Sequence, residues 1–162
     1  MTDFGTRYVV DTNTLTQLGK RRRDSPFFKE NVVIPEEVLR EARGFRDYRS
    51  LKLQVYPTTT GVLELLITIM ATLSSDDRKL VDLYANHGGA DPVVIACALD
   101  AKAQATGQLF QPEWLVVTGD AALRDKALEF SLKVLSNAEF SHILDGETTG
   151  GSRRDQLPGK PW

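Results

Sequence analysis

Two carboxylates stand where short apolar segments end, at the positions expected for residues that follow the strands of a sheet. Asp11 directly follows the segment Arg7–Val10, and Asp120 comes two residues after the segment Trp114–Thr118. In an open α/β sheet, ligands bind outside the carboxyl ends of the strands. Asp11 and Asp120 are therefore candidates for one site at that edge.

Two further acids lie on or beside predicted helices. Asp91 directly precedes a proline at the start of an apolar helix. Another helix carries three glutamates, of which Glu41 falls closest to the apolar stripe when residues turn by about 100° each. Glu36 and Glu37 turn further toward water, which makes Glu41 the candidate to face the sheet.

Each acid also has a purely structural interpretation. Asp11, Asp91 and Asp120 each precede a predicted helix, where a carboxylate commonly serves as the N-cap. Glu41 on its own could be the edge of an amphipathic helix. The functional interpretation depends on all four acids sharing one end of the sheet.

Four clustered carboxylates would raise one another's pKa unless a cation neutralised them. An all-oxygen ligand set without histidine favours Mg²⁺ or Mn²⁺. Such an ion polarises a phosphoryl oxygen and lowers the pKa of a bound water. The four acids thus predict a metal site suited to phosphoryl chemistry.

Short apolar segments alternate with helical patterns along the chain, which predicts a parallel sheet covered on both faces, a three-layer α/β/α sandwich. The predicted strands are Arg7–Val10, Asn31–Ile34, Leu51–Val55, Trp114–Thr118 and Leu132–Ser136. The predicted helical segments are Thr12–Leu18, Pro35–Phe45, Thr60–Leu73, Ser75–Asn86, Pro92–Thr106, Gly119–Phe130 and Asn137–Leu144. A basic turn is expected at Gly19–Pro26.

Length and composition bound the class of protein. The 162 residues suffice for one domain, expected over residues 1–145, and the Gly-, Pro- and charge-rich residues 146–162 are expected to form a flexible tail. The net charge of −2 provides no overall basic field. A nucleic-acid partner would therefore need a local basic patch.

A cytoplasmic location without membrane contact is expected. The one cysteine, Cys97, lies in an apolar run and permits no disulfide. The N-terminus lacks a charged-then-apolar signal pattern. The longest apolar stretch, Val62–Leu73, contains Glu64 and is shorter than the roughly 20 residues that a membrane span needs.

Four segments occur in the order that is typical of PIN-domain ribonucleases: "VVDTNTL", "IPEEVLREAR", "GGADPVVIACAL" and "VVTGDAALRDKA". The resemblance covers residues 8–144, and its more specific parts are "ADPVVIACAL" and "VVTGD". Matched by position, the family's four acids correspond to Asp11, Glu41, Asp91 and Asp120. Glu37 stays a rival to Glu41, since only spacing separates them.

The resemblance also implies supporting residues. Asn13 corresponds to the polar companion of the first acid, and Thr118 to the small hydroxyl residue two places before the fourth acid. Asp125 falls where some members of the family have an additional acid.

By this resemblance, the chain is expected to have the PIN-like sandwich fold and to hydrolyse RNA phosphodiester bonds with Mg²⁺ or Mn²⁺, leaving a 5′-phosphate. Many small bacterial members that resemble it are toxins of the VapC type, held inactive by a partner antitoxin and often dimeric. An antitoxin and a homodimer are therefore expected partners. The longer chain and its tail leave a stand-alone nuclease role open.

Two other segments each have a functional and a structural interpretation. The apolar stretch Val62–Leu73 could be core on two sides, or it could form an interface with a second copy or an antitoxin. A run of four cations could bind the phosphates that flank the scissile bond, or it could be a solvated loop: Lys20, Arg21, Arg22 and Arg23.

Two other functions stay open. A phosphatase of the haloacid-dehalogenase type also has an Asp after its first strand, but it needs a second Asp two residues on, where this chain has Asn13. A nuclease fold kept for binding without catalysis would show no Mn²⁺ affinity that depends on Asp11 and Asp120.

Overall fold

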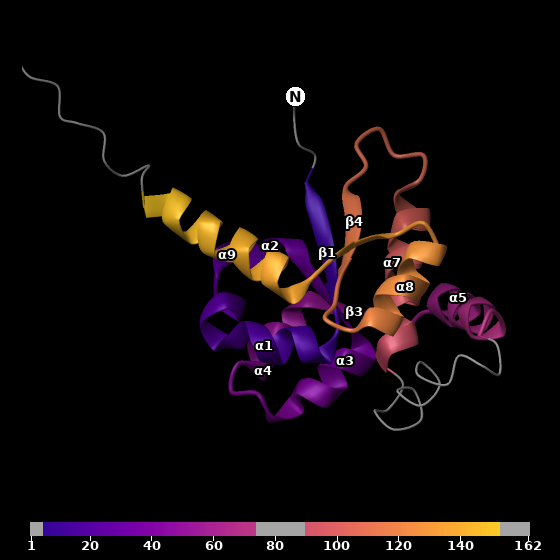
Figure 1. The fold of residues 1–162 in the computed structure, drawn as a ribbon, viewed down its shortest axis with the longest axis horizontal. Helices are drawn as coiled ribbons and strands as arrows, with labels where there is room; N and C mark the ends of the chain where they lie inside the picture. Colours follow the sequence, from indigo (N-terminus) through magenta and orange to yellow (C-terminus); the bar gives the residue numbers. More distant parts are fainter. Residues whose placement is uncertain (1–4, 74–89, 153–162) are drawn as a thin grey trace, which may run out of the picture.

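The computed structural model describes residues 5–73 and 90–152, with the backbone alone at 90, 91 and 148–152. The described chain is an α/β structure in which helices flank one parallel sheet (Figure 1). The strands are β1 (Thr6–Val10), β2 (Val32–Pro35), β3 (Val55–Tyr56), β4 (Glu113–Val117) and β5 (Lys133–Leu135). The helices are α1 (Thr12–Arg23), α2 (Pro26–Asn31), α3 (Glu36–Glu41), α4 (Tyr48–Leu51), α5 (Thr60–Ala71), α7 (Ala90–Ala105), α8 (Ala121–Glu129) and α9 (Asn137–Ser152), with 3₁₀ turns η1 (Ala42–Gly44) and η2 (Lys52–Gln54).

The sheet places β1 at its centre, in the order β3-β2-β1-β4-β5 with every pair parallel. Val9 of β1 is in register with Val33 of β2 and with Val116 of β4. Because the strands run in the same direction, their carboxyl ends meet at one edge, which we call the carboxyl edge. Asp11 follows β1 at this edge, and Thr118 follows β4.

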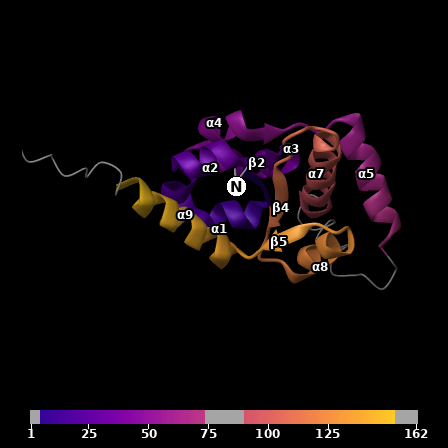
Figure 2. The same ribbon diagram turned by 90° about the horizontal axis from the view of Figure 1, so that it is seen from above.

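Helices cover both faces of the sheet, which confirms the predicted three-layer α/β/α arrangement. One face carries α1, α2 and α9, and the other carries α7 and α8, with α5 outside α7 (Figure 2). On the first face, the ring centroid of Tyr8 in β1 lies 6.1 Å from that of Phe27 on α2 and 4.7 Å from that of Phe140 on α9. The central strand is therefore buried between two helical layers.

Helix α7 forms the middle of the core. It packs against β1, β2 and β4, and residues of its first half are buried whichever way they point. A helix that is apolar on all sides belongs inside a protein, as the sequence predicted for this segment. The buried residues are Val93, Val94, Ile95, Ala96, Cys97 and Ala98.

The predicted third strand is wrong over most of its length, because residues 51–54 form helical turns and only a short β3 follows them. Leu53 is 88% exposed, whereas the neighbouring Gln54 turns inward. Its Nε2 donates to the carbonyl oxygens of Phe28 at 3.0 Å and Val32 at 2.9 Å. The alternation of apolar and polar residues here therefore did not mark the two faces of a strand.

The predicted basic turn is also wrong, because residues 20–23 are helical and belong to α1. This helix bends at Gly19, whose φ of 76° is a conformation that glycine adopts without strain. The short α2 that follows was not predicted, although Ser25 before Pro26 is a helix-start signal. The Ser25 Oγ accepts a hydrogen bond from the N–H of Phe28 at 3.3 Å.

The last helix, α9, continues beyond residue 145, where the predicted tail was to begin, and ends at Ser152. The remaining tail, 153–162, and the predicted helix at 75–86 lie outside the described residues. Within the two described stretches, no helix is both long and apolar enough to cross a membrane.

Candidate functional site

Asp11 is buried at the carboxyl edge, with 3% of its surface exposed. Its Oδ1 accepts a hydrogen bond from the backbone N–H of Thr14 at 2.7 Å, which makes it the N-cap of α1. Its Oδ2 accepts a hydrogen bond from Thr118 Oγ1 at 2.5 Å. The carboxylate therefore both caps a helix and joins two neighbouring strands, so the structural interpretation of Asp11 holds without excluding a functional one.

Asp120 is connected to Asp11 through the same threonine. The Oγ1 of Thr118, which donates to Asp11, accepts a hydrogen bond from the backbone N–H of Asp120 at 3.0 Å. The Oδ1 of Asp120 in turn accepts from the N–H of Leu123 at 2.9 Å and caps α8. Thr118 thus fixes the positions of two predicted site acids.

Asn137, which was not predicted to take part, completes the hydrogen bonds at this edge. Its Oδ1 accepts from Thr14 Oγ1 at 2.6 Å, and its Nδ2 donates to Gln17 Oε1 at 3.0 Å. A Cβ on Gly119 would lie 2.7 Å from that Nδ2, so a side chain at position 119 would force the Asn137 amide to shift. Asn137 is the first residue of α9 and comes two residues after β5 ends, and this place at the end of a strand could have identified it. We call the joined residues Asp11, Thr14, Thr118, Asp120 and Asn137 the carboxyl-edge network.

Glu41 reaches the carboxyl-edge network through Thr12. The hydroxyl of Thr12 donates to Glu41 Oε2 at 2.7 Å, and Thr12 is the residue after Asp11. Glu37 instead accepts from Arg40 Nη1 at 2.9 Å on its own helix. Glu36 accepts from the backbone N–H of Thr58. The hydrogen bonds therefore place Glu41, and not its rival Glu37, beside the first acid, although Glu41 itself is exposed.

The other predicted site residues are less closely connected. Asn13 is exposed near Gly119, since a Cβ there would lie 3.9 Å from Asn13 Nδ2. Asp91 lies in the first turn of α7, and its side chain is outside the described part of the structure. Asp125 is exposed on α8 and forms an ion pair with Arg124 at 3.4 Å. The structure thus connects three of the four acids, while Asp125 faces solvent.

The connected acids do not form a metal-binding cluster in the described structure. Among the described side chains, no three Asp, Glu, His or Cys residues are grouped closely enough to hold a metal ion. Asp11, Asp120 and Glu41 are linked through intervening threonines instead. Asp91 is not included in this comparison because its side chain is not described.

A further buried acid, Asp100, lies on α7 and contacts residues of β3 and α5. Its Oδ2 accepts from the Tyr56 hydroxyl at 2.6 Å and from Gln104 Nε2 at 2.8 Å, and a Cβ on Gly61 would lie 2.8 Å from its Oδ1. Burial and the hydrogen bond to Asp100 raise the pKa of Tyr56. Burial also raises the pKa of the Cys97 thiol to about 12, with a smaller contribution from Asp100. The Tyr56 hydroxyl and the Cys97 thiol are therefore held neutral, and the contacts of Asp100 join β3, α5 and α7.

Arg23 of the predicted phosphate-binding run is part of the core. It is 7% exposed, and its Nε and Nη2 donate to the two carboxylate oxygens of Asp47 at 2.9 and 3.0 Å. Its Nη1 donates to the carbonyl oxygen of Leu15 at 2.6 Å, and its guanidinium lies 4.4 Å from the ring centroid of Phe45. Arg23 is therefore not available to bind RNA.

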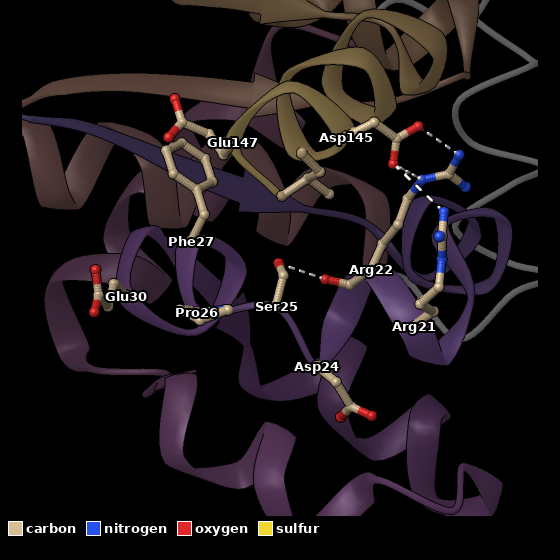
Figure 3. Close-up of a pocket in the computed structure, with 10 residues that line it drawn as sticks. Arg21, Arg22, Asp24, Ser25, Pro26, Phe27, Glu30, Asp145 and Glu147 are labelled. Atoms are coloured by element: carbon tan, nitrogen blue, oxygen red, sulfur yellow. Dashed lines mark hydrogen bonds and ion pairs between the residues drawn. The ribbon is translucent and has the colours of Figure 1, made fainter. Parts of the chain in front are cut away.

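The other three cations of the run pair with acids on α9 and directly after α1. Arg22 donates from Nε and Nη2 to the two carboxylate oxygens of Asp145, at 3.0 Å each, and thereby lowers the pKa of Asp145 (Figure 3). Arg21 lies 3.8 Å from the same carboxylate, and Lys20 pairs with Asp24. Arg21, Arg22 and Asp145 line a cavity of about 790 Å³ between α1, α2 and α9. Asp145 is eight residues beyond Asn137 on α9, about 12 Å along the helix axis from the carboxyl-edge network.

Compared with models of known protein families and with curated proteins, the sequence has no match.

Proposed function

We propose that the chain is a metal-dependent endoribonuclease that hydrolyses RNA phosphodiester bonds at the carboxyl edge. The observation that supports this proposal is the hydrogen-bonded path from Asp11 through Thr118 to Asp120. Two acids that are 109 positions apart in the chain share one threonine at the end of two adjacent strands. Capping each helix would not require that shared contact.

The chain's own residues prepare the site for a charged ligand. The N–H of Thr14 and the hydroxyl of Thr118 hold the Asp11 carboxylate in one orientation. Asp120 uses Oδ1 to cap α8, and Glu41 uses Oε2 to accept from Thr12. A carboxylate oxygen has two lone pairs, so all three acids retain acceptor capacity.

The donor set fits Mg²⁺ or Mn²⁺ in chemistry, because every candidate ligand is a carboxylate oxygen. The residues that would hold the ion are Asp11, Asp91 and Asp120, with Glu41 at the margin. When bound, such an ion supplies a water of lowered pKa and neutralises charge on a phosphoryl oxygen. Because the described acids are linked through threonines and not clustered, small side-chain rotations would have to accompany metal binding.

The finer proposal is that the chain is a toxin of the VapC type, acting in the cytoplasm as a homodimer that an antitoxin inhibits. This proposal comes from the resemblance of the sequence. The exposed side of helix α5 supports the interface with a second copy or an antitoxin. Leu63 and Ile67 are 47% and 69% exposed there, while Val62 and Ile69 are buried. A monomeric mass in solution scattering at micromolar concentration would contradict the dimer.

The test is cleavage of a labelled RNA mixture by the purified chain with Mn²⁺ or with EDTA. We expect cleavage with Mn²⁺ and none with EDTA. Asp11→Asn should lower the rate by at least about 100-fold, because it removes a charge that the metal needs while keeping an oxygen to cap α1.

Two glutamates on one helix provide a matched control. Glu41→Gln should slow cleavage, whereas Glu37→Gln should not, since Glu37 is paired with Arg40 on its own helix. Cleavage that survives both EDTA and Asp11→Asn would contradict the proposal. Absence of cleavage together with absence of Mn²⁺ binding would support a fold kept for binding alone.

A further inference from the structure

A second set of cations, absent from the predicted phosphate-binding run, follows Glu41. Every third residue from 40 to 52 is basic, and the spacing continues through α3, η1, α4 and η2. All five side chains are exposed. We call these residues the basic strip: Arg40, Arg43, Arg46, Arg49 and Lys52.

The basic strip is locally positive in an acidic protein. Residues 40–52 contain five cations and two acids, a net charge of +3, whereas the whole chain carries −2. Of the two acids, Asp47 is buried and bound to Arg23, and Glu41 accepts from Thr12. The arginines of the strip therefore face solvent, and one of them, Arg40, is paired with Glu37 on its own helix.

The strip includes a hollow of about 280 Å³ whose lining contains three cations, one aromatic ring, two apolar residues and one acid, Glu36. Arg40, Arg43, Lys52 and Tyr48 line it, and Lys52 Nζ lies 5.7 Å from the centroid of the Tyr48 ring. Cationic grooves with interleaved aromatic rings bind single-stranded nucleic acid, because phosphates meet the cations and bases stack on the rings. The hollow thus offers cations to a phosphate and a ring to a base, while the carboxylate of Glu36 accepts a hydrogen bond from the N–H of Thr58.

The basic strip begins beside the proposed catalytic acids. Arg40 precedes Glu41, whose carboxylate is bonded to the residue after Asp11. The carboxyl end of β1 points toward α1 and α3 (Figure 1), and α3 carries Arg40, the first residue of the strip. A strand bound along it would pass the carboxyl edge.

We propose that the basic strip binds the phosphate backbone of single-stranded RNA and presents the strand to the carboxyl edge. This inference rests on the proposed nuclease function. It replaces the predicted role of Lys20–Arg23, where Arg23 is buried against Asp47 and Arg22 is bound to Asp145. Arg43, Arg46 and Arg49 form no ion pair with other described residues.

The test is the salt dependence of RNA binding in EDTA, which prevents metal-dependent cleavage. The probe is a fluorescein-labelled oligouridine, and its affinity for the intact chain and variants is measured from about 50 to 500 mM salt. The strip variant is Arg43→Gln with Arg46→Gln and Arg49→Gln. Removing three phosphate contacts should lower the slope of log K against log salt by about 2, since each contact on a single strand contributes about 0.7.

The control variant removes the same charge elsewhere, with Lys29→Gln, Lys102→Gln and Lys133→Gln, all at exposed positions. It should keep the slope of the intact chain. Replacing the three strip arginines by lysine should restore most of the slope, which a purely structural role of those side chains would not. Circular dichroism confirms that each variant is folded.

Equal slopes for the strip and control variants would overturn the inference, and so would absence of oligouridine binding by the intact chain. The nuclease proposal is tested separately by cleavage with Mn²⁺. Cleavage by the intact chain with equal slopes would reject the strip and keep the nuclease. Binding through the strip without cleavage would keep the strip and reject the nuclease.

Discussion

Thr118 is the residue on which the candidate site depends most directly. Its hydroxyl donates to Asp11 at 2.5 Å and accepts from the Asp120 N–H at 3.0 Å. Both hydrogen bonds are shielded from solvent, because Thr118 and Asp11 are each 3% exposed. A buried group that loses its partner costs more than the bond itself contributes.

Thr118→Val should therefore lower the free energy of unfolding by about 1–3 kcal/mol and slow RNA cleavage. Valine has the same shape but leaves Asp11 Oδ2 and the N–H of Asp120 without their partner. Thr118→Ser, which keeps the hydroxyl, is the control and should retain most of the stability and activity. Urea denaturation and the cleavage assay measure both effects. Identical behaviour of the valine and serine variants would contradict the positioning role.

The ion pair of Arg23 and Asp47 joins the end of α1 to the residue before α4. Both side chains are almost completely buried, at 8% and 4% exposure, with two hydrogen bonds between them. Burial raises the pKa of Asp47, but the hydrogen bonds and charge of Arg23 outweigh it, so the pKa lies below its ordinary value. The basic strip extends from this anchored segment.

Arg23→Ala should lower the free energy of unfolding at pH 7 by about 3–5 kcal/mol, because it leaves Asp47 buried without its counter-charge. The stabilisation that Asp47 contributes in the intact chain is complete above its ordinary pKa of about 4 and is lost as the pH falls through the lowered pKa. The difference between variant and intact chain should therefore narrow between pH 7 and pH 3.

Urea denaturation at the two pH values measures that difference. Arg21→Ala is the matched control, since Arg21 is 85% exposed and 3.8 Å from its partner, and it should change stability by less than about 0.5 kcal/mol. A similar loss of stability in both variants would show that the buried pair does not stabilise the contact between the end of α1 and α4. A loss of stability that does not change with pH would show the same.

The sequence predicted the three layers of the fold well because the signals for strands and buried helices are local. Short apolar runs became β1, β2, β4 and β5, and the all-apolar start of α7 became the core. The predicted strand at 51–55 and the turn at 19–26 failed because alternation and charge do not specify local geometry. Leu53 faces solvent while Gln54 bonds to two distant carbonyl groups, contacts that only the tertiary fold provides.

The candidate site was predictable in part for the same reason. Strand-end positions identified Asp11 and Asp120, and helical spacing favoured Glu41 over Glu37. The contacts through Thr12 and Asn137 join residues 29 and 123 positions apart, so no local pattern could reveal them. The run of cations from Lys20 to Arg23 also gave no sign that Arg23 would form a buried ion pair with Asp47. Nor did it indicate that the basic strip would stay exposed.

Mn²⁺ binding followed by electron paramagnetic resonance tests most directly whether the carboxyl edge holds a divalent metal. We expect saturable binding by the intact chain that Asp11→Asn abolishes. Asp24→Asn, the same substitution at the other end of α1, should leave the Mn²⁺ affinity unchanged. Binding that is absent in the intact chain, or equally strong in the Asp11→Asn variant, would contradict the account.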